Sequence, residues 1–222
     1  MTGKLYIVST PIGNLDDITF RAVEVLKSVD LIACEDTRRT LILLEKFNLA
    51  KKLVSYYNYN ERQRAEELIS HLKSGKNIAL VSDSGTPGIS DPGYILIKRA
   101  IEEDIQVIPI PGPTAFVSAL VVSGLPMDEF VFVGFLPHKK GRKTKLQKLA
   151  QEERTIILYE SPHRLLKTLN EILEIFGDRE IAVAKELTKV HEEVFRGKVS
   201  EVLNKLTPDK IKGEFVIVIS GK

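Results

Sequence analysis

Short apolar runs alternate with amphipathic stretches through the first half of the chain. The runs have the length of strands, and apolar residues in the longer stretches recur every three or four positions, as on one face of a helix. This pattern predicts strands over residues 5–9, 31–34, 53–55, 78–82 and 107–110, and helices over residues 19–28, 37–47, 61–73 and 94–103. Strands that alternate with helices are typical of a parallel sheet covered by helices on both faces.

The second half of the chain continues the alternation after a break at Ser123-Gly124-Leu125-Pro126, where a predicted helix over residues 115–122 ends. The pattern there predicts strands over residues 130–135, 155–159, 181–184, 194–196 and 215–219, and helices over residues 165–176 and 199–206. We therefore expect an α/β fold with two α/β/α domains of similar size, residues 1–124 and 125–222. A cleft between two such domains is a natural ligand site.

Two loops rich in Gly and Pro follow predicted strands. The first covers residues 82–93 and the second is Pro111-Gly112-Pro113-Thr114-Ala115. In open α/β sheets, ligands bind outside the carboxyl ends of strands, where small residues let a ligand approach the backbone. The alternative for the first loop is a plain strand-to-helix connection, because Asp91-Pro92 is an ordinary start of a helix. A second loop of this kind after another predicted strand favours a ligand site over a plain connection.

Several common ligands lack their sequence signatures. The loop over residues 9–17 has only Gly13 where a dinucleotide-binding protein carries three glycines, and Gly141-Arg142-Lys143-Thr144 lacks the spacing of a phosphate-binding loop. The four histidines stand far apart, so we predict no metal site. The single cysteine, Cys34, fits a reducing compartment, and we expect a cytoplasmic protein without a membrane span or signal peptide.

Basic residues gather in one segment although the net charge is only +2. Residues 139–148 hold six Lys or Arg and no acid. Such a run is either a solvated helix face or a phosphate-binding surface. We predict RNA contacts from Lys139, Lys140, Arg142 and Lys143.

Six segments, in order along residues 5–221, carry a resemblance to a known family. They are Pro11-Ile12-Gly13-Asn14-Leu15, Glu35-Asp36-Thr37-Arg38, residues 83–93, Pro111-Gly112-Pro113, Tyr159-Glu160-Ser161-Pro162-His163-Arg164 and Lys185-Glu186-Leu187-Thr188-Lys189. The chain resembles the RNA-modifying branch of the tetrapyrrole methylases, the class III S-adenosylmethionine-dependent methyltransferases. The resemblance implies a homodimer that binds S-adenosylmethionine in the interdomain cleft and 2′-O-methylates a cytidine ribose in the decoding region of 16S rRNA, free or in the small subunit.

The resemblance also implies which residues contact the cofactor. They are Pro11, Asp83, Ser84, Gly85, Thr86, Ile89, Thr114, Ala115, Glu160 and Leu187. Tetrapyrrole-modifying relatives tend to carry Gly-Asp-Pro where this chain has Gly85-Thr86-Pro87, a difference that favours RNA.

Methyl transfer to a ribose hydroxyl depends mainly on in-line positioning, helped by a base or by a cation that stabilises the alkoxide. The chemistry and the strand-end positions leave seven candidates for these roles. They are Glu160, His163, Arg164, Lys185, Glu186, Asp36 and Arg38.

Other interpretations stay open from the sequence. A sibling enzyme would use the same cofactor to methylate a carbon of a tetrapyrrole or a modified protein residue, and a module that only binds RNA or senses nucleotides needs no chemistry. Tyr56, Tyr57 and Tyr59 follow a predicted strand and either stack on RNA bases or pack on the scaffold.

Overall fold

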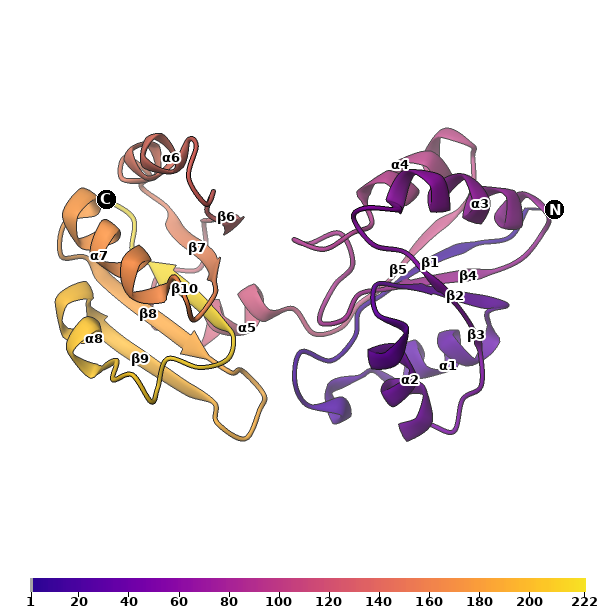
Figure 1. Ribbon diagram of the computed structural model, residues 1–222, viewed down its shortest axis with the longest axis horizontal. Coiled ribbons are helices and arrows are strands. Elements are labelled where there is room, and N and C mark those ends of the chain that lie inside the picture. Colours follow the sequence, from indigo (N-terminus) through magenta and orange to yellow (C-terminus); the bar gives the residue numbers. More distant parts are fainter. Residues whose placement is uncertain (1) are drawn as a thin grey trace. The chain divides into compact units, whose positions relative to one another are not determined.

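The computed structural model describes residues 2–222 and divides the chain into two compact units, one up to Thr114 and one from Ala115 onward (Figure 1). The first unit is a five-stranded, fully parallel sheet with the strand order β3-β2-β4-β1-β5. Its strands are β1 (Leu5–Val8), β2 (Leu31–Cys34), β3 (Lys52–Ser55), β4 (Ile78–Val81) and β5 (Val107–Ile110). Because all five run in the same direction, their carboxyl ends share one edge.

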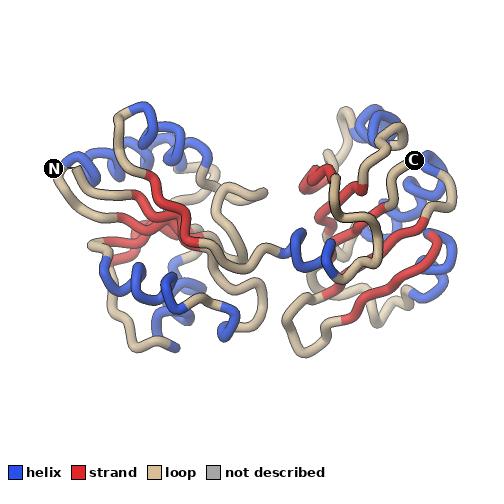
Figure 2. The backbone as a smooth tube through the Cα atoms, turned by 180° about the vertical axis from the view of Figure 1, so that it is seen from behind, coloured by secondary structure: helices blue, strands red, loops and turns tan. Residues whose placement is uncertain are grey.

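Helices cover both faces of this sheet (Figures 1 and 2). They are α1 (Phe20–Ser28), α2 (Thr37–Lys46), α3 (Glu61–Lys73) and α4 (Tyr94–Glu102), with a short 3-10 helix at Leu15–Asp17. Apolar side chains of α1 and α2 form one buried cluster with the sheet, and those of α3 and α4 form another on the opposite face. The central strands β2 and β4 are buried throughout, which explains their continuous apolar sequences.

The second unit has a mixed sheet with the order β6-β7-β10-β8-β9. Its strands are β6 (Phe130–Phe135), β7 (Thr155–Glu160), β8 (Glu180–Lys185), β9 (Glu193–Lys198) and β10 (Phe215–Ile219). Only β6 and β7 pair in parallel; the other neighbours are antiparallel. The helices are α5 (Ala115–Val121), α6 (Arg142–Leu149), α7 (Leu165–Phe176) and α8 (Val199–Lys205).

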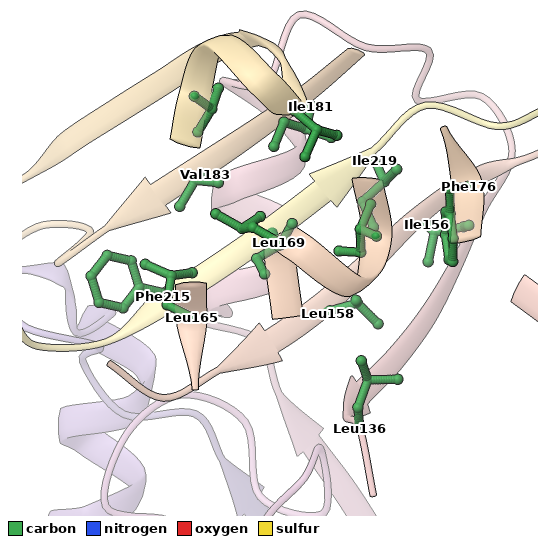
Figure 3. Close-up of a cluster of buried hydrophobic side chains, with 14 of the residues drawn as sticks. Leu136, Ile156, Leu158, Leu165, Leu169, Phe176, Ile181, Val183, Phe215 and Ile219 are labelled. Carbon is green, nitrogen blue, oxygen red and sulfur yellow. The ribbon is translucent and has the colours of Figure 1, made fainter. Parts of the chain in front are cut away.

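One apolar cluster joins α6, α7 and α8 to this second sheet. Leu165 and Leu169 of α7 lie in it with Leu158, Val183 and Phe215 of three strands (Figure 3). Each unit thus has its own core, and the expected α/β fold with two domains is confirmed.

The boundary between the units falls earlier than the expected break after residue 124. Helix α5 contacts β7 and β10 of the second sheet and buries Ala119 and Leu120. The Gly and Pro residues at 124–126 therefore end a helix of the second unit. No helix within residues 2–222 is long and apolar enough to cross a bilayer.

Candidate active site

Backbone hydrogen bonds join the loops after β1 and β4 at the carboxyl edge of the first sheet. The amide of Thr10 donates to the Gly85 carbonyl at 2.9 Å, and the amide of Gly85 donates to the Thr10 carbonyl at 3.0 Å. Gly85 has φ +83°, a left-handed conformation that side-chain-bearing residues rarely adopt. The loop over residues 82–93 therefore folds back on the β1 loop with a fixed shape.

Three hydroxyl groups meet where the loops after β1, β4 and β5 converge. Thr86 Oγ1 lies 2.8 Å from Ser9 Oγ and 2.8 Å from Thr114 Oγ1. A Cβ added at Gly112 would lie 2.8 Å from the Ser9 Cβ, so glycine permits the close approach of the β5 loop. This cluster, Ser9–Thr86–Thr114, offers several hydrogen-bonding atoms at the edge where open α/β sheets bind ligands.

The predicted cofactor residues divide between the two units. Those of the first unit gather around the converging loops and are Pro11, Asp83, Ser84, Gly85, Thr86, Ile89 and Thr114. Ala115, Glu160 and Leu187 belong to the second unit. Ser9 is not among the predicted residues, although it ends the first predicted strand and its hydroxyl joins this cluster.

Asp36 and Arg38 pair with each other at the start of α2. The Arg38 guanidinium donates to both Asp36 oxygens, at 3.0 and 2.6 Å, and the Arg38 amide donates to Asp36 Oδ1 at 2.9 Å. Hydrogen bonds from the Arg38 side chain and then its backbone lower the pKa of Asp36 to about 2. A carboxylate with so low a pKa is a weak proton acceptor.

Asp83 links this charged segment to the loop after β4. Its Oδ1 accepts from the Asp36 amide at 2.9 Å, and its Oδ2 lies 3.7 Å from Arg39 Nε. Burial, followed by the charge of Asp83, raises the pKa of Glu35. The pKa of Cys34 is also raised, chiefly by burial, so this thiol is poorly suited to act as a nucleophile.

Glu160, at the end of β7, is a buried carboxylate whose two oxygens have partners inside the second unit. Oε1 accepts from the Ser161 amide and from Arg164 Nε, both at 2.8 Å, and Oε2 accepts from Thr168 Oγ1 at 2.6 Å. Its side chain has no exposed surface. This geometry suits a residue that holds the turn over residues 161–164 in place.

Arg142 differs from the prediction that it contributes to a basic surface. Its side chain is only 6% exposed, and its guanidinium donates to Glu171 Oε2 at 2.8 Å, Thr168 Oγ1 at 2.7 Å and the Pro137 carbonyl at 3.2 Å. Leu146 and Leu149 follow on the same buried face of α6, which explains why Arg142 points inward. The other three predicted RNA contacts, Lys139, Lys140 and Lys143, are exposed.

Two of the predicted catalytic groups lie where β8 ends. Burial opposes ionisation of Glu186, but hydrogen bonds from Lys189 Nζ at 2.8 Å and the Glu214 amide at 2.9 Å outweigh it and lower the pKa of Glu186. Lys185 is largely buried and lines an open hollow of about 440 Å³ together with Glu186, His191 and Asp209. Leu187, next in the chain, is buried.

Comparison with known proteins identifies the family. The profile described as Tetrapyrrole (Corrin/Porphyrin) Methylases matches residues 4–203. The chain belongs to this family. The resemblance predicted from six short segments is thereby confirmed.

Curated relatives match over nearly the whole chain. A Thermotoga maritima protein named Ribosomal RNA small subunit methyltransferase I is 52% identical over 99% of both chains. A Synechocystis protein of the same name is 54% identical over 99% of this chain and 79% of its own. The family's fold is also seen in a Thermus thermophilus uroporphyrin-III C-methyltransferase complexed with S-adenosyl homocysteine, at 17% identity and a TM-score of 0.70, covering 98% of this chain and 97% of that one.

Proposed function

We propose that this protein is an S-adenosylmethionine-dependent methyltransferase that 2′-O-methylates a cytidine ribose in the decoding region of 16S rRNA. The observation that carries the proposal is the 52% identity, over 99% of both chains, with a relative named as a small-subunit rRNA methyltransferase. The protein acts on free 16S rRNA or the small ribosomal subunit, in the cytoplasm, as a homodimer.

The loops at the carboxyl edge of the first sheet supply the cofactor contacts. Thr86, Ser9 and Thr114 present hydroxyls, and the left-handed Gly85 lets S-adenosylmethionine approach the backbone. A solved family member was crystallised with the demethylated form of this cofactor. Thr86 stands where tetrapyrrole-modifying relatives tend to have aspartate, which favours RNA over a tetrapyrrole.

Bound S-adenosylmethionine would supply the methyl group to the ribose 2′-oxygen and would leave as a neutral thioether when its carbon–sulfur bond breaks. The hydroxyl proton passes to a base. Glu160 has both oxygens engaged and Asp36 has a pKa of about 2, so neither suits this role. His163 lies exposed on the turn that Glu160 holds, and its imidazole can accept a proton.

Arg164 and Lys185 are the cations of the second unit available for the developing alkoxide or a substrate phosphate. Arg164 donates to Glu160 and to the Leu136 carbonyl at 3.2 Å, so its position is fixed. A fixed cation stabilises developing charge without reorganising during the reaction.

The test is transfer of a labelled methyl group by the purified protein to three substrates: small ribosomal subunits, free 16S rRNA and uroporphyrinogen III. We expect label in the RNA of at least one of the first two. Label in the tetrapyrrole alone would replace the proposed substrate with that of other family members, and no transfer to any substrate would favour a binding module.

A further inference from the structure

Two exposed tyrosines follow β3 at the carboxyl edge of the first sheet. Tyr57 is 40% exposed and Tyr59 is 97% exposed. Their ring centroids lie 6.3 Å apart with an interplanar angle of 61°, so the rings meet edge to face. Exposed aromatic rings offer apolar faces to a binding partner.

Hydrogen bonds hold the backbone of the segment that carries these rings. Tyr56, unlike its neighbour, is buried; its hydroxyl donates to Glu61 Oε1 at 2.8 Å and accepts from the Leu96 amide at 3.2 Å. Asn60 Oδ1 accepts from the Tyr57 amide at 2.8 Å, and Asn60 Nδ2 donates to the Ser55 carbonyl at 3.2 Å. A ring on an anchored backbone loses less freedom when it stacks on a ligand.

Two arginines lie on the adjoining connection of the same edge, together with the acids Glu35 and Asp36. The Tyr56 amide donates to the Cys34 carbonyl at 2.8 Å, which extends the pairing of β3 with β2 to the point where Glu35–Arg39 begins. In that segment Arg38 is 87% exposed along its side chain, although it pairs with Asp36. Aromatic faces beside cations form the usual surface for unpaired nucleotides, because rings stack on bases while cations contact phosphates.

We propose that Tyr57 and Tyr59 stack on unpaired bases of the RNA substrate beside the nucleotide to be methylated. The inference rests on the proposed function and adds to it the recognition of single-stranded RNA by the first unit. Stacking involves no charge, so these rings contribute affinity that salt does not screen.

The experiment measures binding of a single-stranded oligonucleotide from the decoding region, and of the same sequence as a duplex, over a range of salt concentrations. We expect Tyr57→Ala and Tyr59→Ala each to weaken single-strand binding about tenfold, with an unchanged salt slope and little effect on the duplex. Tyr59→Phe keeps the ring and should bind like the wild type. Ile101→Ala, which removes another exposed apolar side chain near the carboxyl end of α4, at the opposite edge of the sheet, is the control.

A fluorescent base analogue, 2-aminopurine, reports stacking directly. Its emission in the bound strand should be quenched by the wild type and by Tyr59→Phe, and recover with Tyr59→Ala. Wild-type affinity and quenching in the double variant Tyr57→Ala/Tyr59→Ala would overturn the inference. A loss of affinity for assembled small subunits, without a loss for the oligonucleotide, would also overturn it, because it would indicate a contact with ribosomal protein.

The two proposals fail in different ways. If the wild type methylates rRNA and the double variant matches it in RNA binding and KM, only the stacking surface is wrong. If the wild type transfers no methyl group to any rRNA substrate, the proposed function is wrong and the stacking surface falls with it. Cofactor affinity should stay unchanged in every tyrosine variant.

Discussion

Glu160 and Arg142 are buried charged residues that hold two turns of the second unit. From the sequence, Glu160 has the position of a catalytic carboxylate, directly after a strand, and Arg142 lies in a basic run. The direction of each side chain depends on partners far along the chain, chiefly Thr168, which bonds to both. Sequence spacing locates such residues but does not separate a buried anchor from a group that faces substrate.

Removing Arg142 should cost stability because Glu171 would keep only its longer ion pair with Lys167, at 4.0 Å, and the buried Glu160 carboxylate would lose a nearby positive charge. We expect Arg142→Met to lower the free energy of unfolding by about 2–3 kcal/mol. This is less than the largest losses seen when a buried ion pair is broken, because Glu160 still pairs with Arg164. Lys143→Met, at the exposed neighbouring position, is the matched control in urea unfolding. Equal effects of the two substitutions would show that the buried network contributes nothing.

The kinetics of two variants separate the proposed roles of Asp36 and His163 in methyl transfer. With a pKa of about 2, Asp36 is ionised on both sides of neutrality, so any contribution it makes is lost only as the pH falls towards that value. Asp36→Asn should therefore leave the shape of the kcat profile between pH 5 and 9 unchanged. His163→Gln, which removes the proposed proton acceptor, should lower kcat. A pH profile altered by Asp36→Asn, together with an unchanged kcat in His163→Gln, would reverse the assignment.

At the scale of elements, the apolar pattern predicted all five strands of each unit. The pattern is clearest in β2, β4 and β10, which are short apolar runs buried throughout. Helix α6 was not predicted. Its buried face consists of Arg142, Leu146 and Leu149, and the other positions are mostly exposed and polar. Because one of the three buried residues is an arginine, the segment lacks the apolar periodicity that predicts a helix. The order of the strands could not be read from the sequence, since it depends on which connections cross over the sheet.

The loop after β4 requires glycine at residue 85. Gly85→Ala places a side chain at φ +83°, which costs about 1–2 kcal/mol, and disturbs the loop that we assign to the cofactor. Gly124→Ala is matched, because Gly124 has φ +79°, ends α5 and has nothing within 4 Å of an added Cβ. Thermal unfolding should show a similar loss in both variants, and titration calorimetry should show weaker S-adenosylmethionine binding only for Gly85→Ala. Unchanged cofactor affinity in Gly85→Ala would remove this loop from the site.

Across the whole molecule, the chain forms two units with separate cores, and candidate functional residues lie on both. The family, fold class and number of domains followed from six segments and the alternation of elements, and all three are confirmed. The position of the boundary between the units could not be predicted from the sequence. A Gly-Pro break such as that at residues 124–126 is expected both at the end of a domain and at the end of a helix.

The exposed lysines of the second unit should supply the electrostatic part of RNA binding. Replacing Lys139, Lys140 and Lys143 together by Gln should reduce the slope of log affinity against log salt by about two, if each contacts one phosphate. S-adenosylmethionine affinity should not change. A salt slope equal to that of the wild type would place the RNA path on another surface.

The proposed modification is tested most directly by nucleoside mass spectrometry of 16S rRNA from cells with and without this protein. We expect one 2′-O-methylcytidine of the decoding region to disappear in its absence and to return when the wild-type protein is restored. An identical set of modified nucleosides in both strains would contradict the account.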